Sequence, residues 1–199
     1  MIKSIAPFLV ISLLAAPAFA QEAETPSDPA DELDLGSPTE PLTADELVPG
    51  QPYVRGASGD WEFRCLKAEE GAVDPCQIYQ LLKDDQGTDV AEISIFPLPG
   101  SQRAAAGATI VVPLETQLTE QLTISVDGRS PRVYAFTFCN TAGCVARVGF
   151  TRDEINAFKN GRAATLRMVP AAAPDQEVLL EVSLIGFTAG YDELEAELQ

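Results

Sequence analysis

The chain has 199 residues, with 30 acidic and 13 basic side chains, no histidine and four cysteines. Its net charge of −17 argues against nucleic acid and against anionic lipid as partners, because both are bound through clustered lysine and arginine. The absence of histidine excludes Ser-His-Asp and Cys-His catalysis and every zinc site that needs an imidazole ligand. Composition therefore narrows the classes of function without choosing one.

Residues 1–20 predict a cleaved secretory signal peptide. Lys3 supplies a positive charge, an almost continuous apolar run follows, and residues 18–20 (Ala-Phe-Ala) place small side chains where a signal peptidase reads them. The run is shorter than the about 20 residues that span a membrane, and Pro7 and Pro17 interrupt it, which disfavours an uncleaved anchor helix. We therefore expect cleavage before Gln21, a periplasmic or secreted protein, and no stable membrane span after cleavage.

Residues 21–56 are acidic and rich in proline, and we predict that they form a disordered linker. Up to residue 54 this segment has no basic side chain, and its first aromatic one is Tyr53. Such a segment buries too little apolar surface to offset the entropy of ordering, and its like charges extend it. Its nine acidic residues are Glu22, Glu24, Asp28, Asp31, Glu32, Asp34, Glu40, Asp45 and Glu46.

Cys65, Cys76, Cys139 and Cys144 predict disulfides, because an even count of cysteines in an exported protein favours structural bridges. Chain entropy favours a long bridge such as Cys65–Cys144, worth about 4.5 kcal/mol, over Cys65–Cys76 (about 2.8) and Cys139–Cys144 (about 2.2). Hairpin geometry favours the local pairs, since alternating runs around residues 140–143 place Cys139 opposite Cys144. We expect the two local pairs. The spacings match neither a redox C-x-x-C motif nor a zinc pattern.

Residues 57–188 predict a single all-β domain, a β-sandwich or barrel-like fold of about nine strands with one short helix. The helix starts at a capping box formed by Thr151 and Glu154, flanked by Phe150 and Ile155 as a hydrophobic staple, and Gly161 ends it. The domain is long enough to bury a core without oligomerising, so we expect a monomer. The predicted strands are 61–66, 76–83, 90–96, 109–112, 122–126, 132–138, 145–150, 164–169 and 178–186.

The charge is concentrated outside this domain. Between residues 55 and 187 there are 17 acidic and 12 basic side chains, so the domain is only mildly acidic. The rest of the charge lies in the leader and in residues 189–199, which we predict to be an acidic C-terminal tail, at most a short frayed helix. Two flexible, solubilising ends therefore explain the low isoelectric point.

An ordered set of short motifs resembles the invasion-associated locus B family of exported bacterial proteins. This resemblance implies a disulfide-containing, β-rich exported domain, named for an association with host-cell invasion. It implies no established catalytic residue, so none is carried over to this chain. The motifs are Gly59-Asp60-Trp61, Pro75-Cys76-Gln77, Val112-Pro113-Leu114, Cys139 with Gly143-Cys144, and Ser183-Leu184-Ile185-Gly186-Phe187-Thr188-Ala189.

Without histidine, acid–base chemistry would fall to carboxylates. Asp84, Asp85 and Asp89 cluster around Gly87, and a pair of them could act on a glycosidic bond or bind Ca²⁺ weakly. The run Asp-Asp-Gln-Gly-Thr is also ordinary turn composition, and we favour a turn between two strands.

Other polar and aromatic candidates give weaker signals. Ser58 and Ser101 have no partner base and are poor nucleophiles. Trp61 is the only tryptophan, and its strand pattern favours a core position over a binding anchor. Arg129 and Arg132 bracket a turn and could hold an acidic ligand, although a solvated turn is the simpler interpretation.

These observations favour an exported, non-catalytic binding or envelope-interaction protein, with no cofactor and with an unidentified protein or envelope component as its partner. A carboxylate-based hydrolase acting on cell-wall polysaccharide is the alternative, and it depends only on the three aspartates. Inhibition of an exported enzyme is a further alternative that sequence does not separate from binding.

Overall fold

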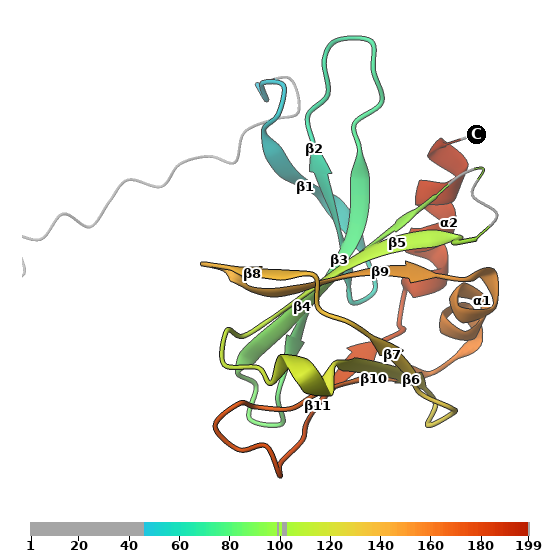
Figure 1. Cartoon of the computed structure of the whole chain (residues 1–199). Coiled ribbons are helices and arrows are strands. Elements are labelled where there is room, and N and C mark those ends of the chain that lie inside the picture. The colour runs from blue at the N-terminus through green and yellow to red at the C-terminus, as the bar shows by residue number, and fades with distance from the viewer. Residues whose placement is uncertain (1–45, 99, 101–102, 199) are drawn as a thin grey trace, which may run out of the picture. The chain divides into compact units, whose positions relative to one another are not determined.

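A computed structural model describes residues 46–98, 100 and 103–198. In these ranges the chain forms eleven β-strands, two α-helices and one 3₁₀ helix, which confirms the predicted all-β class (Figure 1). The strands are β1 (Pro52–Ser58), β2 (Trp61–Leu66), β3 (Cys76–Lys83), β4 (Asp89–Pro97), β5 (Ala106–Val112), β6 (Leu122–Val126), β7 (Arg132–Tyr134), β8 (Phe138–Asn140), β9 (Gly143–Phe150), β10 (Ala163–Met168) and β11 (Val178–Ser183). The helices are η1 (Leu118–Glu120), α1 (Arg152–Asn160) and α2 (Phe187–Glu197).

The strands make two antiparallel sheets. Seven strands follow the order β1-β2-β3-β4-β5-β9-β8, and four follow the order β11-β10-β6-β7. Strands β1 to β5 are neighbours both in sequence and in space, so short connections build most of the larger sheet. Sequence alternation places the bounds of β2, β3 and β6 correctly, because in each a row of apolar side chains faces the core.

The predicted strand at 132–138 is wrong as one element. The chain pairs with β6 along β7, leaves that sheet at Ala135, and joins β9 of the larger sheet along β8. Alternating aromatic residues suggested a continuous strand, but only the partner strands decide where pairing stops. Phe136 packs against the core, whereas Phe138 lies exposed on β8.

The predicted linker 21–56 ends too late. Residues 52–56 belong to β1, which pairs with β2 as an edge strand and has a bulge at Arg55. Most of β1 is exposed, and so it lacks the apolar alternation that marks a strand in sequence. Its order comes from hydrogen bonds to β2. The predicted signal peptide and the leader up to residue 45 lie outside the described residues.

Helix α1 begins and ends as its sequence predicts. The Thr151 hydroxyl accepts a hydrogen bond from the amide of Glu154, and the Glu154 carboxylate accepts one in return from the amide of Thr151, at 2.8 Å. Ile155 and Phe158 are buried beneath it. At Gly161, where the helix ends in extended backbone, an added Cβ would lie 2.5 Å from the Val126 side chain, so close packing, and not a left-handed conformation, requires glycine there.

The C-terminal segment 189–199 is helical over most of its length, but it belongs to the packed helix α2 and is not the frayed acidic tail that the sequence predicted. Phe187, Tyr191 and Leu194 form an apolar stripe at helical spacing, each no more than 2% exposed. The Tyr191 hydroxyl donates to the Ala105 carbonyl at 3.0 Å. The acidic residues between these three positions made the segment resemble a solvated tail in sequence.

The acidic side chains of α2 are ion-paired. Arg55 of β1 contacts Glu193 and Glu197 at 2.9 and 2.7 Å, and Lys159 of α1 contacts Asp192 and Glu195. These four carboxylates therefore do not form the flexible charged end that composition suggested.

A chain of aromatic contacts runs through the core. Trp61 meets Phe187 edge-on at 5.4 Å between ring centroids, Phe187 meets Phe158 at 5.4 Å, and Phe158 meets Phe150 at 5.1 Å. Tyr134 ends the series at 5.8 Å from Phe150. The contacts join β2, α2, α1, β9 and β7, and Trp61 is fully buried as the sequence predicted.

Candidate functional site

The motifs at residues 59–61 and 183–186 meet at the junction of the two sheets. The Trp61 indole donates to the Ser183 carbonyl at 2.8 Å, and the Ser183 hydroxyl donates to the Asp60 carboxylate at 2.5 Å. Gln80, 7% exposed on β3, accepts from the Ser183 amide at 2.8 Å and donates to the Ser183 carbonyl at 3.1 Å. These residues hold β11 against β2 and β3, and their polar atoms are already used there.

Ser58 belongs to the same junction. Its hydroxyl donates to the Gly186 carbonyl at 2.9 Å, which gives the side chain a structural role. Ser101, the other serine considered from sequence, lies outside the described residues.

The cysteines form the two local pairs that the sequence leads us to expect. Cys65 faces Cys76 across β2 and β3, and Cys139 faces Cys144 across β8 and β9. The second hairpin turns more tightly than expected, because Asn140 and Gly143 also pair. A side chain at Gly143 would overlap the Val112 carbonyl, so this glycine lets β9 approach β5 closely.

The three aspartates at residues 84–89 form a turn between β3 and β4. The Asp84 carboxylate accepts hydrogen bonds from the amides of Gln86 and Thr88 at 3.0 and 2.8 Å, and Asp89 is ion-paired with Lys83. Such bonds from a side chain to its own turn are the usual role of aspartate there. The turn that the sequence favoured is therefore present, and the alternative catalytic use of these aspartates stays an untested hypothesis. Within the described ranges, no three His, Cys, Asp or Glu side chains gather closely enough to hold a metal ion.

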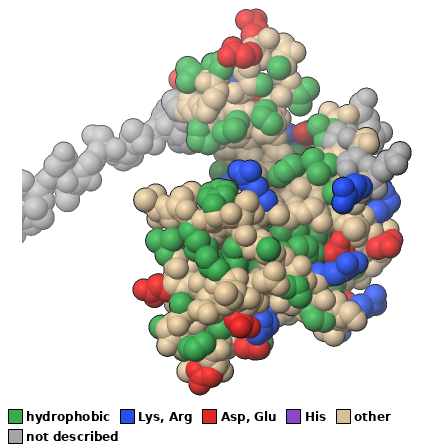
Figure 2. Space-filling view, viewed as in Figure 1, with side chains coloured by type: hydrophobic (Ala, Val, Ile, Leu, Met, Phe, Trp, Pro, Cys, Tyr) green, Lys and Arg blue, Asp and Glu red, His purple; other side chains and the backbone are tan. Residues whose placement is uncertain are grey.

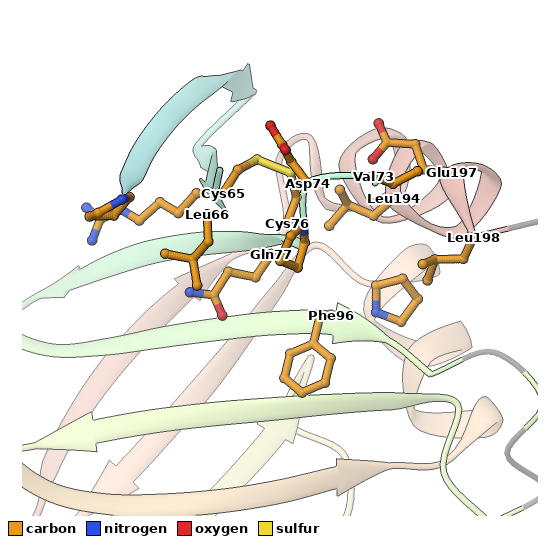
Figure 3. A pocket seen from close by; sticks show the side chains of 14 residues that line it. Cys65, Leu66, Val73, Asp74, Cys76, Gln77, Phe96, Leu194, Glu197 and Leu198 are labelled. Carbon is orange, nitrogen blue, oxygen red and sulfur yellow. A yellow bond between two sulfur atoms is a disulfide. The ribbon is translucent and has the colours of Figure 1, made fainter. Parts of the chain in front are cut away.

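A groove of about 530 Å³ lies between the disulfide-bridged end of the β2–β3 hairpin and the end of α2 (Figure 3). We call it the hairpin groove. Leu66, Val73 and Leu198 are 47%, 69% and 47% exposed, so its walls present apolar surface to solvent. Figure 3 shows Leu194 and Glu197 reaching it from α2, and Leu198 from the residue after the helix. Its lining is Pro52, Arg64, Cys65, Leu66, Val73, Asp74, Pro75, Cys76, Gln77, Phe96, Pro97, Leu194, Glu197 and Leu198.

Hydrophobic side chains also gather on the outer surface near this groove. Figure 2 shows them over β1 and the β2–β3 hairpin, with acidic side chains at the hairpin tip. The tip sequence contains Glu69 and Glu70. The apolar surface is therefore bordered by polar residues, an arrangement typical of interaction sites.

The three charged residues that line the hairpin groove each have a partner within the chain. Arg64 contacts Glu62 at 3.0 Å and lies over the Tyr79 ring. Glu197 contacts Arg55. Asp74 accepts hydrogen bonds from the Tyr53 hydroxyl at 2.5 Å and from the Ala68 amide at 2.8 Å.

These bonds, together with the charge of nearby Lys67, lower the pKa of Asp74 below its usual value. Asp74 is therefore held as a carboxylate, and it ties the loop after β2 back to β1.

A second cavity, of about 340 Å³, lies between α1 and the turn that joins β6 to β7. We call it the arginine-turn pocket. The structure does bring Arg129 and Arg132 together on its wall, which Asp153 and Glu154 of α1 also line. Its other lining residues are Ile124, Ser125, Val126, Ser130, Tyr134, Phe150, Ala157 and Phe158.

Both carboxylate oxygens of Glu154, which lines this pocket, have partners. Its Oε1 atom accepts from the Tyr134 hydroxyl at 2.6 Å and lies 3.6 Å from Arg132 Nε, while its Oε2 atom accepts from Thr151. Burial alone would raise the pKa of Glu154, but the bonds from Thr151 and Tyr134 and the Arg132 charge together lower it. Burial and the neighbouring carboxylate raise the pKa of Tyr134. Glu154 is thus ionised and its charge is compensated locally.

Sequence reasoning identified the arginine turn but missed the hairpin groove. Leu194 and Leu198 were assigned to a polar tail, and Leu66 and Val73 looked like unremarkable loop or strand-end residues. The helical spacing of Phe187, Tyr191 and Leu194 was the signal that would have placed α2 beside the hairpin.

Comparison with known proteins decides the family. A family model described as invasion associated locus B (IalB) protein matches residues 61–195, more than half of the chain. The chain belongs to the IalB family. In this chain most of the motifs that suggested the family lie at the sheet junction, at the disulfides and in close backbone contacts.

Individual relatives agree with this IalB assignment. An invasion protein B homolog of Brucella abortus (strain 2308) is 28% identical over 157 residues, which cover 77% of this chain and 86% of the homolog. A homolog of Brucella abortus biovar 1 (strain 9-941) matches to the same extent. The crystal structure of invasion associated protein b from Bartonella henselae covers 71% of this chain and 95% of its own, with a TM-score of 0.59 and 23% identity, and so it supports the fold.

Two disulfides fit an exported IalB protein, because such bridges persist in oxidising compartments. Neither helix in the described part of the chain has the length and apolarity that crossing a membrane requires.

Proposed function

We propose that this IalB-family chain is an exported, non-catalytic binding protein whose hairpin groove receives apolar side chains of a protein partner. It acts as a monomer in the periplasm or after secretion. The observation that carries the proposal is the exposed apolar lining of the groove, supplied by Leu66, Val73 and Leu198. Apolar surface of this kind gains free energy when a partner covers it.

Charge also favours an apolar occupant. Arg64, Asp74 and Glu197 each have an ion-pair partner in the chain (Glu62, Lys67 and Arg55), so a charged ligand would have to displace an existing contact. Apolar side chains meet no such cost. The volume of about 530 Å³ is within the range of binding sites that hold a few side chains or one small molecule.

The disulfide makes the groove a rigid surface. Cys65 and Cys76 lie in its wall, and Asp74 fixes the loop between them through Tyr53 and Ala68. A preformed wall loses little conformational freedom when a partner binds, and this raises the affinity obtained from a small apolar contact.

Site-specific photo-crosslinking tests the proposal. A photoreactive side chain at Val73 of the full chain, expressed in its own cell envelope, should give a discrete crosslinked protein. Leu66→Asp should abolish that product, because it puts a charge in the groove wall. Leu179→Asp should not, because Leu179 is 60% exposed on β11, away from the groove.

Equal yields from the two aspartate variants, or repeated failure to crosslink any envelope protein, would overturn the proposal. Binding of the purified chain to neutral lipid vesicles that is lost in Leu66→Asp would assign the groove to lipid instead, and would also contradict it.

A further inference from the structure

Strand β11 ends the smaller sheet with a regular, unpaired edge. The larger sheet ends at β1, which has Pro52 and a bulge at Arg55, and at β8, which has three residues. The smaller sheet ends at β7, also of three residues, and at β11, which runs for six residues without proline or bulge. Short, bulged or proline-containing edges resist pairing with another chain, whereas a regular edge such as β11 favours it.

The backbone groups of β11 point alternately toward β10 and toward the free edge. At Ser183 the outward amide and carbonyl are already bonded, to the Gln80 side chain and to the Trp61 indole. Because outward groups recur at every second residue of a strand, the amides and carbonyls of Leu179 and Glu181 face the same way. They form no hydrogen bond with any residue that the structure describes. Two amides and two carbonyls of β11 are therefore available to a further strand.

A groove of about 610 Å³ lies beside this edge, and we call it the edge groove. Glu181 and Ser183 of β11 line it, and so do Leu81 and Lys83 of β3. Pairing between β2 and β3 stops at Tyr79, so Leu81 and Lys83 extend past β2 without a strand on that side. The edge groove is thus bordered by unpaired stretches of two strands, and such a site suits an extended backbone.

The charge of the edge groove favours a basic occupant. Its two basic side chains, Arg64 and Lys83, are already ion-paired with carboxylates of the chain. Glu181 has no ion pair with any described residue, and Thr165, which faces it from β10, carries no charge. A lysine or arginine directly opposite Glu181 would therefore be attracted, whereas an acidic side chain would be repelled. β11 has no basic residue, so a second copy of this strand would not supply that attraction.

We propose that β11 binds an extended segment of a partner protein by strand addition, with a lysine or arginine of that segment opposite Glu181. Every described strand pair is antiparallel, and an antiparallel segment places the residue opposite Leu179 two positions after the basic one. Leu179 is 60% exposed, so an apolar side chain at that position covers it, and the recognised pattern is basic-x-apolar. The inference does not depend on the function proposed for the hairpin groove, with which the edge groove shares only Arg64.

Backbone NMR of the full chain, titrated with the peptide acetyl-Thr-Thr-Lys-Thr-Val-Thr-amide, tests this site. The amide signals of Leu179 and Glu181 should shift saturably, and both amides should exchange more slowly with solvent. N-methylation of the peptide at its lysine and valine should abolish both effects, because these two residues donate to β11. N-methylation at its second and fourth residues is the matched control and should preserve the effects, because those amides point away from β11.

Variants of the chain test the charge. Glu181→Gln should weaken binding of the lysine peptide by about two- to fivefold. Glu120→Gln, exposed on η1, is the matched control and should bind as the parent does, and so should Leu66→Asp, which tests the hairpin groove. Equal binding of the two N-methylated peptides, or no saturable shift with the unmodified peptide, would overturn the proposal. Protection of the Leu179 and Glu181 amides that rises with concentration of the chain alone would assign the edge to a second copy and would equally contradict it.

Discussion

The backbones of Gly59 and Gly186 are in close contact where the turn between β1 and β2 meets the start of α2. Both have positive φ, at 58° and 84°, and the amide of Asp60 donates to the Ile185 carbonyl at 3.1 Å. An added Cβ on Gly59 would lie 2.5 Å from the Ile185 oxygen, and one on Gly186 would overlap Ser58. Two glycines thus allow the turn and the helix start to interlock.

Replacing Gly186 with alanine should destabilise the domain by about 2 kcal/mol or more, since strain at positive φ adds to a backbone clash. Gly56→Ala is the matched control. Gly56 has open space around it and should change stability by less than about 0.5 kcal/mol. Denaturant unfolding measures both, and equal losses would show that the interlocked contact does not matter.

Replacing Gln80 should lower the stability of the domain nearly as much as replacing Gly186. A side chain of similar size would still fill its place on β3, so the loss would come from the missing hydrogen bonds. Gln80→Leu removes the side-chain acceptor of the Ser183 amide and one of the two side-chain donors to the Ser183 carbonyl, in a nearly dry junction, at a cost of about 1–3 kcal/mol. Gln77→Leu, on the same strand but outside this junction, is the comparison for thermal unfolding. A smaller loss for Gln80→Leu than for Gln77→Leu would contradict the role given to this side chain.

Helix α2 should behave as core and not as a tail. Phe187→Ala removes a fully buried ring that contacts Trp61, Phe158 and Tyr191, and should cost about 3–5 kcal/mol. Leu198 lies just beyond the helix and is half exposed. Leu198→Ala should therefore change the free energy of unfolding by less than about 0.5 kcal/mol relative to the parent. Equally small losses of stability in both variants would contradict the core role of α2.

Asp74 should make the hairpin loop sensitive to acid. Its pKa is lowered in the folded protein, so its contribution is complete above the ordinary value of about 3.9 and is lost as pH falls through the lowered value. The protection factor of the Ala68 amide, which is its hydrogen exchange corrected for the intrinsic pH dependence, should therefore fall in that acidic range. Asp74→Asn should show fast exchange already at neutral pH, whereas Glu69→Gln in the same loop should not.

Variants in the turn at residues 84–89 distinguish a structural role of its aspartates from a catalytic one. Asp84→Ala should cost about 0.5–2 kcal/mol, as the loss of a capping carboxylate does elsewhere, because two amides lose their acceptor. Asp85→Ala should change stability by less than about 0.5 kcal/mol. A cell-wall-hydrolysing activity of the purified chain that both variants abolish would revive the hydrolase alternative.

Local sequence pattern predicted the elements whose stability is local. The bounds of β2, β3 and β6 follow from alternation, and the start of α1 follows from the capping box of Thr151 and Glu154, since both are patterns within a few residues. The cysteine pairs also follow from hairpin geometry. β1 and the division between β7 and β8 do not, because each depends on which strand lies alongside.

The large negative charge can be counted from composition, but which of the acidic side chains are ion-paired depends on the fold. Sequence alone determined that the chain lacks the basic clusters that bind nucleic acid, that histidine chemistry is absent, and that the domain is β-rich. Only the tertiary structure decided that the acids of α2 are paired with Arg55 and Lys159, and that Leu66 and Leu198 meet in one groove. The physical reason is that these ion pairs and this groove join residues far apart in sequence, 33 positions for Lys159 and Asp192 and 138 for Arg55 and Glu193, and no local pattern records such contacts.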